Sequence, residues 1–488
     1  MNLRKSIMAI AIVATALPSL AQYATDAFRF SGGNNSATAR FNALGGAQTA
    51  IGGDLTSLYG NPAGLGMFTK SEFSFTPSYN INKNETAFLG SNKMLNSNNS
   101  NLNNIGIVFH SPVSKSDNLT TGILSFNFGV GYQKTNFFRN EINLGGGVTN
   151  LTGLGDYFAE AANSENASFN NFKSNVIYGA YDGYLISDVP INSTNFESNT
   201  DVNTNQNLRL NTKGNQSNVD FSMGVNVSNK VYLGATLGLA SINYTSNNIL
   251  NESSNFFGTQ KSYSANLVNN YDTRGSGVNF KLGAILKPVY EFRIGLSLET
   301  PTWYRMSDNF SQEISLRNFK DKDVSETDNY PFDYRLSTPL KLNGGISYFI
   351  GKKGFLTANI NYVDYSGIRF RSDKNSVNQN TNSTLTNNYK EALNYSFGAE
   401  FKLVDNLMIR AGYTGLGNPY RNTTYKAENY SGGLGYRFGN YYLDGAVVVR
   451  NNNAVNEYAS YTFNAGDEPV AAINTQSTNI SVTFGARF

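Results

Sequence analysis

Apolar and polar residues alternate one by one through much of this chain. This is the pattern of β-strands with one apolar and one polar face. The last eleven residues are the clearest case, because Ile480, Val482, Phe484, Ala486 and Phe488 alternate with small or polar residues. Similar segments precede them at 73–81, 105–109, 124–132, 219–227, 231–239, 278–286, 292–298, 340–350, 356–362, 393–403, 407–413, 430–438 and 441–449. These segments predict about fourteen strands, and 292–317 is either one strand interrupted at Pro301 or two.

Composition favours placing all of these strands in one closed sheet. Only 15% of residues are charged, whereas the chain has 30 Tyr, 33 Phe and 46 Gly. Scarce charge and abundant aromatic rings are typical of transmembrane β-barrels, whose outward faces meet lipid. We therefore predict an all-β fold, an antiparallel outer-membrane barrel over residues 71–488 with membrane lipid around it. The terminal Phe488 resembles the signal read by the barrel-assembly machinery, which is a predicted partner.

The predicted connections alternate in length. Short ones fall at 287–291, 351–354, 404–406 and 439–440, and long ones at 135–218, 247–273, 319–330, 372–389 and 452–477. This alternation is typical of barrels with short periplasmic turns and long outer loops. Within the longest connection, 151–162 predicts an amphipathic helix over the barrel mouth, and 192–218 predicts a solvated segment.

The first 21 residues have the features of an export signal. Arg4 and Lys5 precede an apolar stretch at 7–17, and a small-x-small site predicts cleavage after Ala21. Residues 22–70 show no strand pattern. Their short runs between paired glycines, one of them capped by Asp54, predict small helices that form a plug, or hatch, inside the barrel.

The hatch carries a family resemblance. Residues 43–47 are Ala-Leu-Gly-Gly-Ala, residues 52–54 are Gly-Gly-Asp, and Asn61, Pro62, Ala63 and Gly64 precede Leu65. This order resembles the hatch of the FadL/OmpP1/TodX family of outer-membrane transporters for hydrophobic compounds, and Asn61 to Gly64 correspond to the hatch signature. The resemblance covers the whole order of signal, hatch, strands and aromatic terminus.

The resemblance implies a route for apolar molecules. They bind among the outer loops, enter a pocket in the barrel and leave through a lateral opening beside a kinked third strand, while the hatch shifts. The third strand here contains Asn127, Gly129 and Gly131, where a bend is expected because glycine permits bulges. The outer loops share no recognisable motif with the family, so the residues that bind substrate stay unassigned.

Few residues point to catalysis or to a cofactor. The single histidine, His110, stands at a strand end and is expected to be a polar rim residue; cysteine is absent. The acidic segment 321–328 lacks the glycine turn of an EF-hand and predicts a solvated loop. A formal net charge of +3 without a basic stripe argues against nucleic acid as a partner. We expect no catalytic residues, no metal and no cofactor.

Charged residues within the strands fall on the face opposite the apolar series. They are Lys281, Arg293, Glu299, Glu400, Lys402, Arg410, Arg437, Asp444, Arg450 and Arg487. Exposure of an arginine or lysine to mid-membrane lipid costs about 2–4 kcal/mol, so these side chains are predicted to face the lumen. There we expect them to pair with one another and with the hatch.

Two classes of function follow. The first is passive transport of long-chain fatty acids or other hydrophobic small molecules. The alternative is surface binding, either adhesion or haem capture by the long loops, with Tyr157, Tyr178 or Tyr181 as the available axial ligands. A third class, an outer-membrane hydrolase, lacks a recognisable catalytic set.

Overall fold

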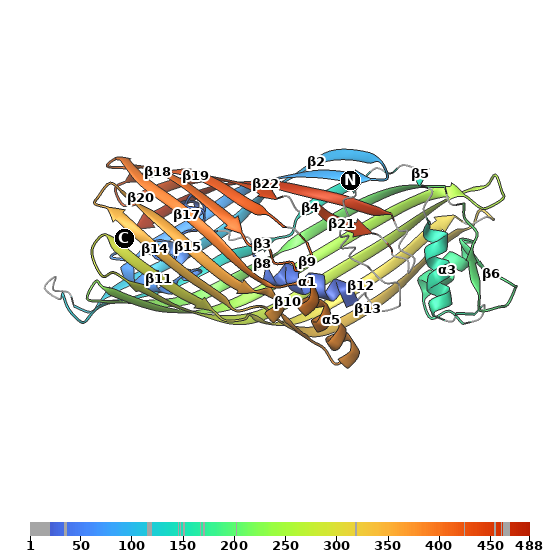
Figure 1. Ribbon diagram of the computed structural model, residues 1–488, viewed down its shortest axis with the longest axis horizontal. Coiled ribbons are helices and arrows are strands. Elements are labelled where there is room, and N and C mark those ends of the chain that lie inside the picture. Colours follow the sequence, from blue (N-terminus) through green and yellow to red (C-terminus); the bar gives the residue numbers. More distant parts are fainter. Residues whose placement is uncertain are drawn as a thin grey trace.

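The computed structural model describes residues 20–33, 37–114, 120–144, 146, 148–149, 152–165, 167–168, 171–201, 203–317, 320–423, 425–452, 455–459, 461 and 469–488. They form a closed antiparallel barrel of fourteen strands, which confirms the predicted fold (Figure 1). Most of the predicted export signal, residues 1–19, lies outside the described residues. Cleavage after Ala21 stays a prediction.

Twenty strand segments make up the barrel wall. They are β1 (Glu72–Phe88), β2 (Ser91–Pro112), β3 (Ile123–Phe137), β4 (Asn140–Leu144), β5 (Val148–Thr149), β8 (Thr204–Val227), β9 (Val231–Asn255), β10 (Ser262–Leu286), β11 (Phe292–Glu299), β12 (Trp303–Arg317), β13 (Asp323–Ser337), β14 (Lys341–Ile350), β15 (Gly354–Asp364), β16 (Arg369–Arg371), β17 (Glu391–Val404), β18 (Leu407–Leu416), β19 (Ala427–Phe438), β20 (Tyr441–Asn452), β21 (Val455–Ala459) and β22 (Val470–Arg487). Because β11 and β12 both pair with β10, residues 292–317 are one barrel strand interrupted around Pro301.

The barrel closes between the two ends of the sheet. β1 pairs with β22 from Glu72 opposite Arg487 to Ala87 opposite Ala472. Beyond this ladder, the backbone N–H of Ser71 donates to Phe488 at 3.1 Å, and the N–H of Phe488 donates back to Ser71 at 2.9 Å. The closed sheet leaves no strand edge in lipid.

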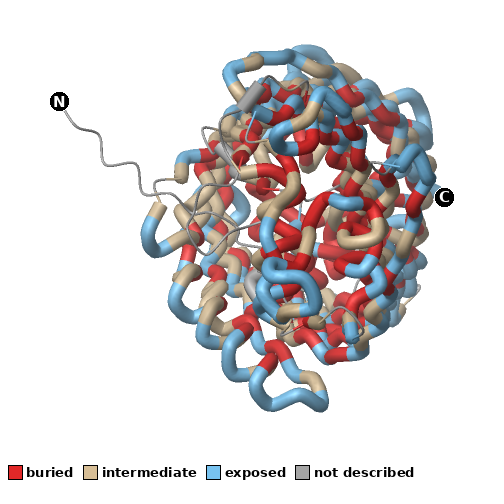
Figure 2. The backbone as a smooth tube through the Cα atoms, turned by 90° about the vertical axis from the view of Figure 1, so that its right-hand side faces the viewer, coloured by how far each residue is buried: buried red, intermediate tan, exposed pale blue. Residues whose placement is uncertain are grey.

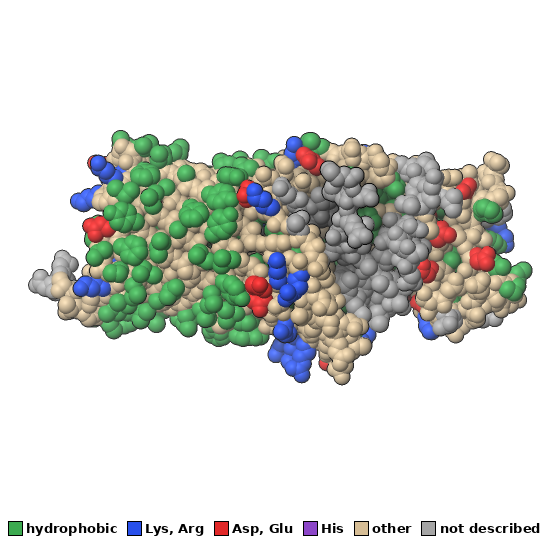
Figure 3. Space-filling model, viewed as in Figure 1, with side chains coloured by type: hydrophobic (Ala, Val, Ile, Leu, Met, Phe, Trp, Pro, Cys, Tyr) green, Lys and Arg blue, Asp and Glu red, His purple; other side chains and the backbone are tan. Residues whose placement is uncertain are grey.

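Outward apolar side chains form a band around the half of the barrel that carries the short turns (Figure 3). The last strand follows the predicted alternation, since Ile480 and Val482 are exposed and Ser481 and Thr483 are buried. The band places the protein in the outer membrane, crossed by its strands. In the described part of the chain, every helix is too short or too polar to cross a bilayer.

Beyond the band, the strands run on where loops were predicted. The predicted loop 247–273 lies almost entirely within β9 and β10, and much of 192–218 lies within β8. The predicted loop 319–330 is mostly β13. These predictions were wrong because strands outside the bilayer no longer need apolar outward faces; only their inward positions, such as Leu250 and Leu267, stay apolar and buried.

Three groups of helices occupy or cover the lumen, and buried backbone fills the ring of strands in end view (Figure 2). The hatch contributes α1 (Leu20–Ser31), α2 (Ala39–Ala43), η1 (Leu55–Leu58) and η2 (Pro62–Met67). A cap at the outer end consists of α3 (Leu154–Ser164), α4 (Asn175–Asp182), β6 (Ile186–Asp188) and β7 (Phe196–Ser198). The third group flanks β16: η3 (Tyr365–Gly367) precedes this strand, and α5 (Asn375–Asn388) lies between it and β17.

Candidate functional site: the occupied lumen

Asn61 begins the last turn of the hatch and ties it to the wall. Its Oδ1 accepts from the Ala63 N–H at 3.1 Å and so caps η2, whose first residue is Pro62. Its Nδ2 donates to the carbonyl of Thr49 at 2.7 Å and to that of Ala284 in β10 at 3.3 Å. The amide thus holds two parts of the hatch and one barrel strand together.

The hatch backbone approaches the wall at glycines. A Cβ on Gly234 would lie 2.3 Å from the carbonyl carbon and oxygen of Pro62, and one on Gly283 would lie 1.9 Å from Oδ1 of Asn61. Within the hatch, a Cβ on Gly64 would lie 2.8 Å from Cα of Gly52. Other wall glycines that would meet hatch atoms in this way are Gly106, Gly129, Gly131, Gly224, Gly295, Gly345, Gly398, Gly412 and Gly433. The hatch is therefore seated against strands around the barrel.

Adding a single methyl group at such a seat tests this fit. We expect Gly234→Ala to destabilise the seated hatch by about 1–3 kcal/mol, because the obstructing atoms are backbone. Hydrogen exchange of the amides of residues 37–70 in the purified barrel is then about tenfold faster. Gly445→Ala is the matched control, since a Cβ there meets nothing within 4 Å. Equal exchange in both variants would contradict the close contact between the hatch and the wall at Gly234.

The predicted kink residues of the third strand also contact the hatch. Asn127 is buried, and its Nδ2 donates to the Phe68 carbonyl at 3.2 Å. Gly129 and Gly131 face Leu58 and Tyr59. β3 pairs continuously with both neighbours through these three positions, and its register against β8 shifts at 123–125 and 134–136. The kink itself stays a prediction.

His110 supports Asn127 from the adjacent strand. The two residues are paired across β2 and β3, and His110 Nδ1 lies 2.7 Å from Asn127 Oδ1. The histidine backbone N–H donates to Ser71 Oγ at 3.1 Å. The imidazole therefore orients an amide that holds the hatch.

Inward charges form a network with the hatch, as predicted. Arg40 of α2 donates to both carboxylate oxygens of Glu400, at 2.9 and 3.2 Å. Arg410 bridges Glu400 at 2.6 Å and Asp444 at 2.8 Å, and Arg437 reaches Asp444 at 2.9 Å. These pairs link α2 to β17, β18, β19 and β20.

Further out, α1 lies in a chamber lined by aromatic rings. The Tyr23 ring centroid lies 5.0 Å from that of Phe332 and 5.3 Å from that of Phe370, and Phe28 stacks on Tyr389 at 4.3 Å. Phe30 is buried in the same cluster. Ring pairs at these spacings contribute beyond simple area burial. The wall of this chamber is suited to apolar or aromatic surfaces.

Two acidic groups, Asp308 of the wall and Asp26 of α1, lie in this chamber. Asp308 on β12 is 4% exposed. It lies outside the apolar band, because the outward positions beside it are Ser307 and Asn309. Burial, with the nearby Asp26 carboxylate of α1 adding to it, raises the pKa of Asp308 to about 7. Near neutral pH this carboxyl is partly protonated.

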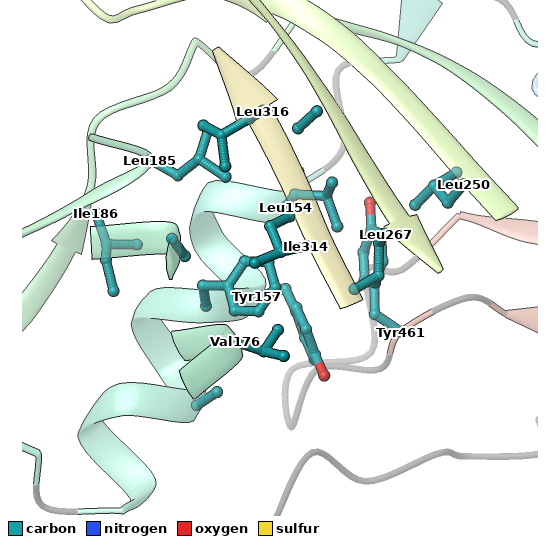
Figure 4. Packing of buried hydrophobic residues seen from close by; sticks show 14 of the residues in the cluster. Leu154, Tyr157, Val176, Leu185, Ile186, Leu250, Leu267, Ile314, Leu316 and Tyr461 are labelled. Carbon is teal, nitrogen blue, oxygen red and sulfur yellow. The ribbon is translucent and has the colours of Figure 1, made fainter. Parts of the chain in front are cut away.

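The cap closes the outer end, and the helix predicted at 151–162 is confirmed as α3. Leu154 and Tyr157 of α3 lie toward Ile314 of β12 in an apolar cluster (Figure 4). Carboxylates on barrel strands bind the N-termini of both cap helices. The Leu154 N–H of α3 donates to Glu252 at 2.9 Å, and the Val176 N–H of α4 donates to Asp328 at 3.1 Å. Burial raises the pKa of Glu252.

Sequence reasoning missed these two carboxylates. Asp328 belongs to the segment expected to be a solvated loop, yet it is buried and accepts from Ser174 Oγ at 2.6 Å. Glu252 falls at the same inward parity as Leu250 on β9. Extending the alternation past the apolar band would have found both residues on the inner face.

The sequence also matches a protein-family model, that of the outer membrane protein transport protein family (OMPP1/FadL/TodX), over residues 191–458. The match covers more than half of the chain. The chain belongs to this family. A search of curated protein sequences finds no match. As a member of a transport family, the chain is a transport protein of the outer membrane.

Solved structures share the fold of this FadL-family chain at low sequence identity. A Pseudomonas aeruginosa FadL homologue has a TM-score of 0.54 at 12% identity, with 93% of this chain and 98% of that one covered. The CymD monoaromatic hydrocarbon channel has a TM-score of 0.52 at 13% identity, covering 94% and 98%. The Pseudomonas putida toluene transporter TodX has a TM-score of 0.52 at 12% identity, covering 93% and 99%.

The tyrosines considered for haem capture have packing roles in this FadL-family barrel. Tyr157 is buried in the cap, Tyr181 donates to Asp188 at 3.1 Å, and Tyr178 packs edge-on against Phe172. Among the described residues, no group of three or more His, Cys, Asp or Glu side chains is placed to hold a metal ion.

Proposed function

We propose that this protein carries hydrophobic small molecules, such as long-chain fatty acids or hydrocarbons, passively across the outer membrane. The observation that carries the proposal is the ring-lined chamber that α1 of the hatch fills. Apolar burial contributes about 25 cal/mol per Å², so such a wall retains a ligand with few polar contacts. Two solved structures of the same fold, a toluene transporter and a monoaromatic hydrocarbon channel, agree with this ligand class.

We propose a lateral exit rather than an axial one. The hatch seats on wall glycines at many strands, which opposes passage along the barrel axis. On the lipid side of β2, β3, β8, β9 and β10 lies an apolar groove of about 450 Å³, lined by Phe109, Phe128, Phe221 and Phe280 among others. Ser222 and Thr236 also line it, and both hydroxyls donate to the Leu58 carbonyl of the hatch, at 3.1 and 3.3 Å. The same two wall residues therefore border the groove on the lipid side and bond the hatch.

Ligand extraction and uptake test the proposal together. We expect organic extracts of the detergent-purified barrel to contain a fatty acid or hydrocarbon. Cells that express the protein should take up labelled palmitate or toluene faster than cells without it. Uptake should fall on deletion of 22–70 and on Asn61→Ala, because Asn61 joins the hatch to Thr49 and Ala284.

Asn451→Ala is the matched control, since this asparagine is exposed near the end of β20, opposite Glu428. It should leave uptake unchanged. An empty barrel and equal uptake with and without the protein would contradict hydrophobic transport.

A further inference from the structure

Three arginines form a row on the outside of the barrel. Arg305 of β12 is directly opposite Arg335 of β13, and Arg335 is directly opposite Arg371 of β16. All three are exposed on the outward face, while the residues beside them, such as Tyr304 and Leu336, are buried inward. Opposed residues on neighbouring strands have Cβ atoms about 5 Å apart, so three positive charges span roughly 10 Å.

The row lies at the outer border of the apolar band. Trp303 is two positions nearer the band on β12 and is 48% exposed, as expected for an aromatic side chain at the membrane interface. Two residues along a strand correspond to about 7 Å, which places the arginines at the level of lipid headgroups. Arg369, opposite Ser337, adds a fourth exposed arginine one step closer to the band. Basic side chains gather beside α5 at this border (Figure 3).

The described residues do not neutralise the row. Like charges placed directly opposite each other across strands are destabilising. In the part of the chain that the structure describes, Arg305, Arg335 and Arg371 form no ion pair. The nearest outward acid on β13, Asp333, lies opposite Ser307, one step further from the membrane. Most other exposed arginines do have partners, as Arg274 does with Asp272 at 3.4 Å.

From this arrangement we infer a binding site for the phosphate groups of a phosphorylated glycolipid of the outer leaflet, formed by Arg305, Arg335 and Arg371. Guanidinium groups bind phosphate through paired, charge-assisted hydrogen bonds. The row faces the lipid side at headgroup depth, so the acyl chains of the same lipid lie along the apolar band below it. The site is separate from the lumen and from the transport route.

Binding of lipid A to the full-length, detergent-purified barrel tests the inference. The wild type is expected to bind bisphosphorylated lipid A and to bind the same lipid without phosphates much more weakly. The triple variant Arg305→Gln, Arg335→Gln, Arg371→Gln should lose affinity for the phosphorylated lipid by about 30-fold. The single variant Arg335→Gln should lose about fivefold, and Arg335→Lys should lose less, because lysine keeps the charge but not the paired hydrogen bonds of the guanidinium.

The matched control replaces three exposed basic residues of the outer strands and turns: Arg209→Gln, Arg317→Gln and Lys322→Gln. It has the same change of charge and should bind like wild type. Equal binding of both lipids would overturn the inference, because acyl contacts alone would then explain binding. If the row binds inorganic phosphate but not lipid A, it holds an adventitious ion only, and this result would also overturn the inference. So would normal binding by the folded triple variant or by folded Arg335→Gln.

Discussion

Replacing Arg410 with methionine is expected to destabilise the barrel by about 3–5 kcal/mol, because it leaves buried carboxylates without their central partner. The Arg410 side chain is fully buried and lies between Glu400 and Asp444. Asp444 is 1% exposed, and among the ion pairs of the described residues it keeps that with Arg437, while Glu400 keeps that with Arg40 of the hatch. Methionine matches the length of the arginine stem but supplies no charge.

The single tryptophan, Trp303, reports unfolding in urea through its fluorescence. Lys402→Met is the matched control, since Lys402 pairs with a fully exposed Asp405 in a turn, 2.8 Å away. Exposed pairs contribute about 0–1 kcal/mol, so this variant should resemble wild type. A loss below about 1 kcal/mol for Arg410→Met would mean that the network contributes little.

Asp308→Asn is expected to stabilise the protein at pH 8 by about 2–4 kcal/mol and to have little effect at pH 4. The pKa of Asp308 is raised to about 7 in the folded protein from an ordinary value of 3.8. Between these values the folded state holds a proton that the unfolded state has released. The wild type therefore loses stability as the pH rises from about 4 to about 7, and asparagine removes this loss.

Urea titrations from pH 4 to pH 8 measure the effect through Trp303 fluorescence. Asp323→Asn is the control, because Asp323 is exposed at the far end of β13, opposite Arg317. Parallel stability curves for wild type and Asp308→Asn would show that the carboxyl has no raised pKa.

The wall of the barrel was predictable because lipid imposes a strict alternation on every strand. Ile480 and Val482 had to face outward, and Lys281 and Arg410 had to face inward, whatever their partners. Their partners were not predictable, because Asp220 pairs with Lys281, and Glu400 with Arg410, only after the sheet has closed.

The strand extensions and the chamber were harder to predict. Above the bilayer the outward residues are Asn, Ser and Thr, which also favour turns, so local sequence predicted loops. Packing of Tyr23 against Phe332 and Phe370 joins residues more than 300 positions apart. No local pattern indicates such a contact. The glycine seats were visible only as frequent glycines, with no indication of which hatch atom each one meets.

Closure of the sheet by β1 and β22 has a consequence for biogenesis. The first strand of the wall stays unpaired on one side until the last strand is present, because Ser71 pairs with Phe488 and Glu72 with Arg487. A chain cut short anywhere before residue 470 therefore leaves β1 with a row of unpaired N–H and C=O groups, which hydrocarbon cannot satisfy. Such a fragment is a poor candidate for insertion and a template for aggregation, so premature termination should yield material for degradation rather than a leaky pore.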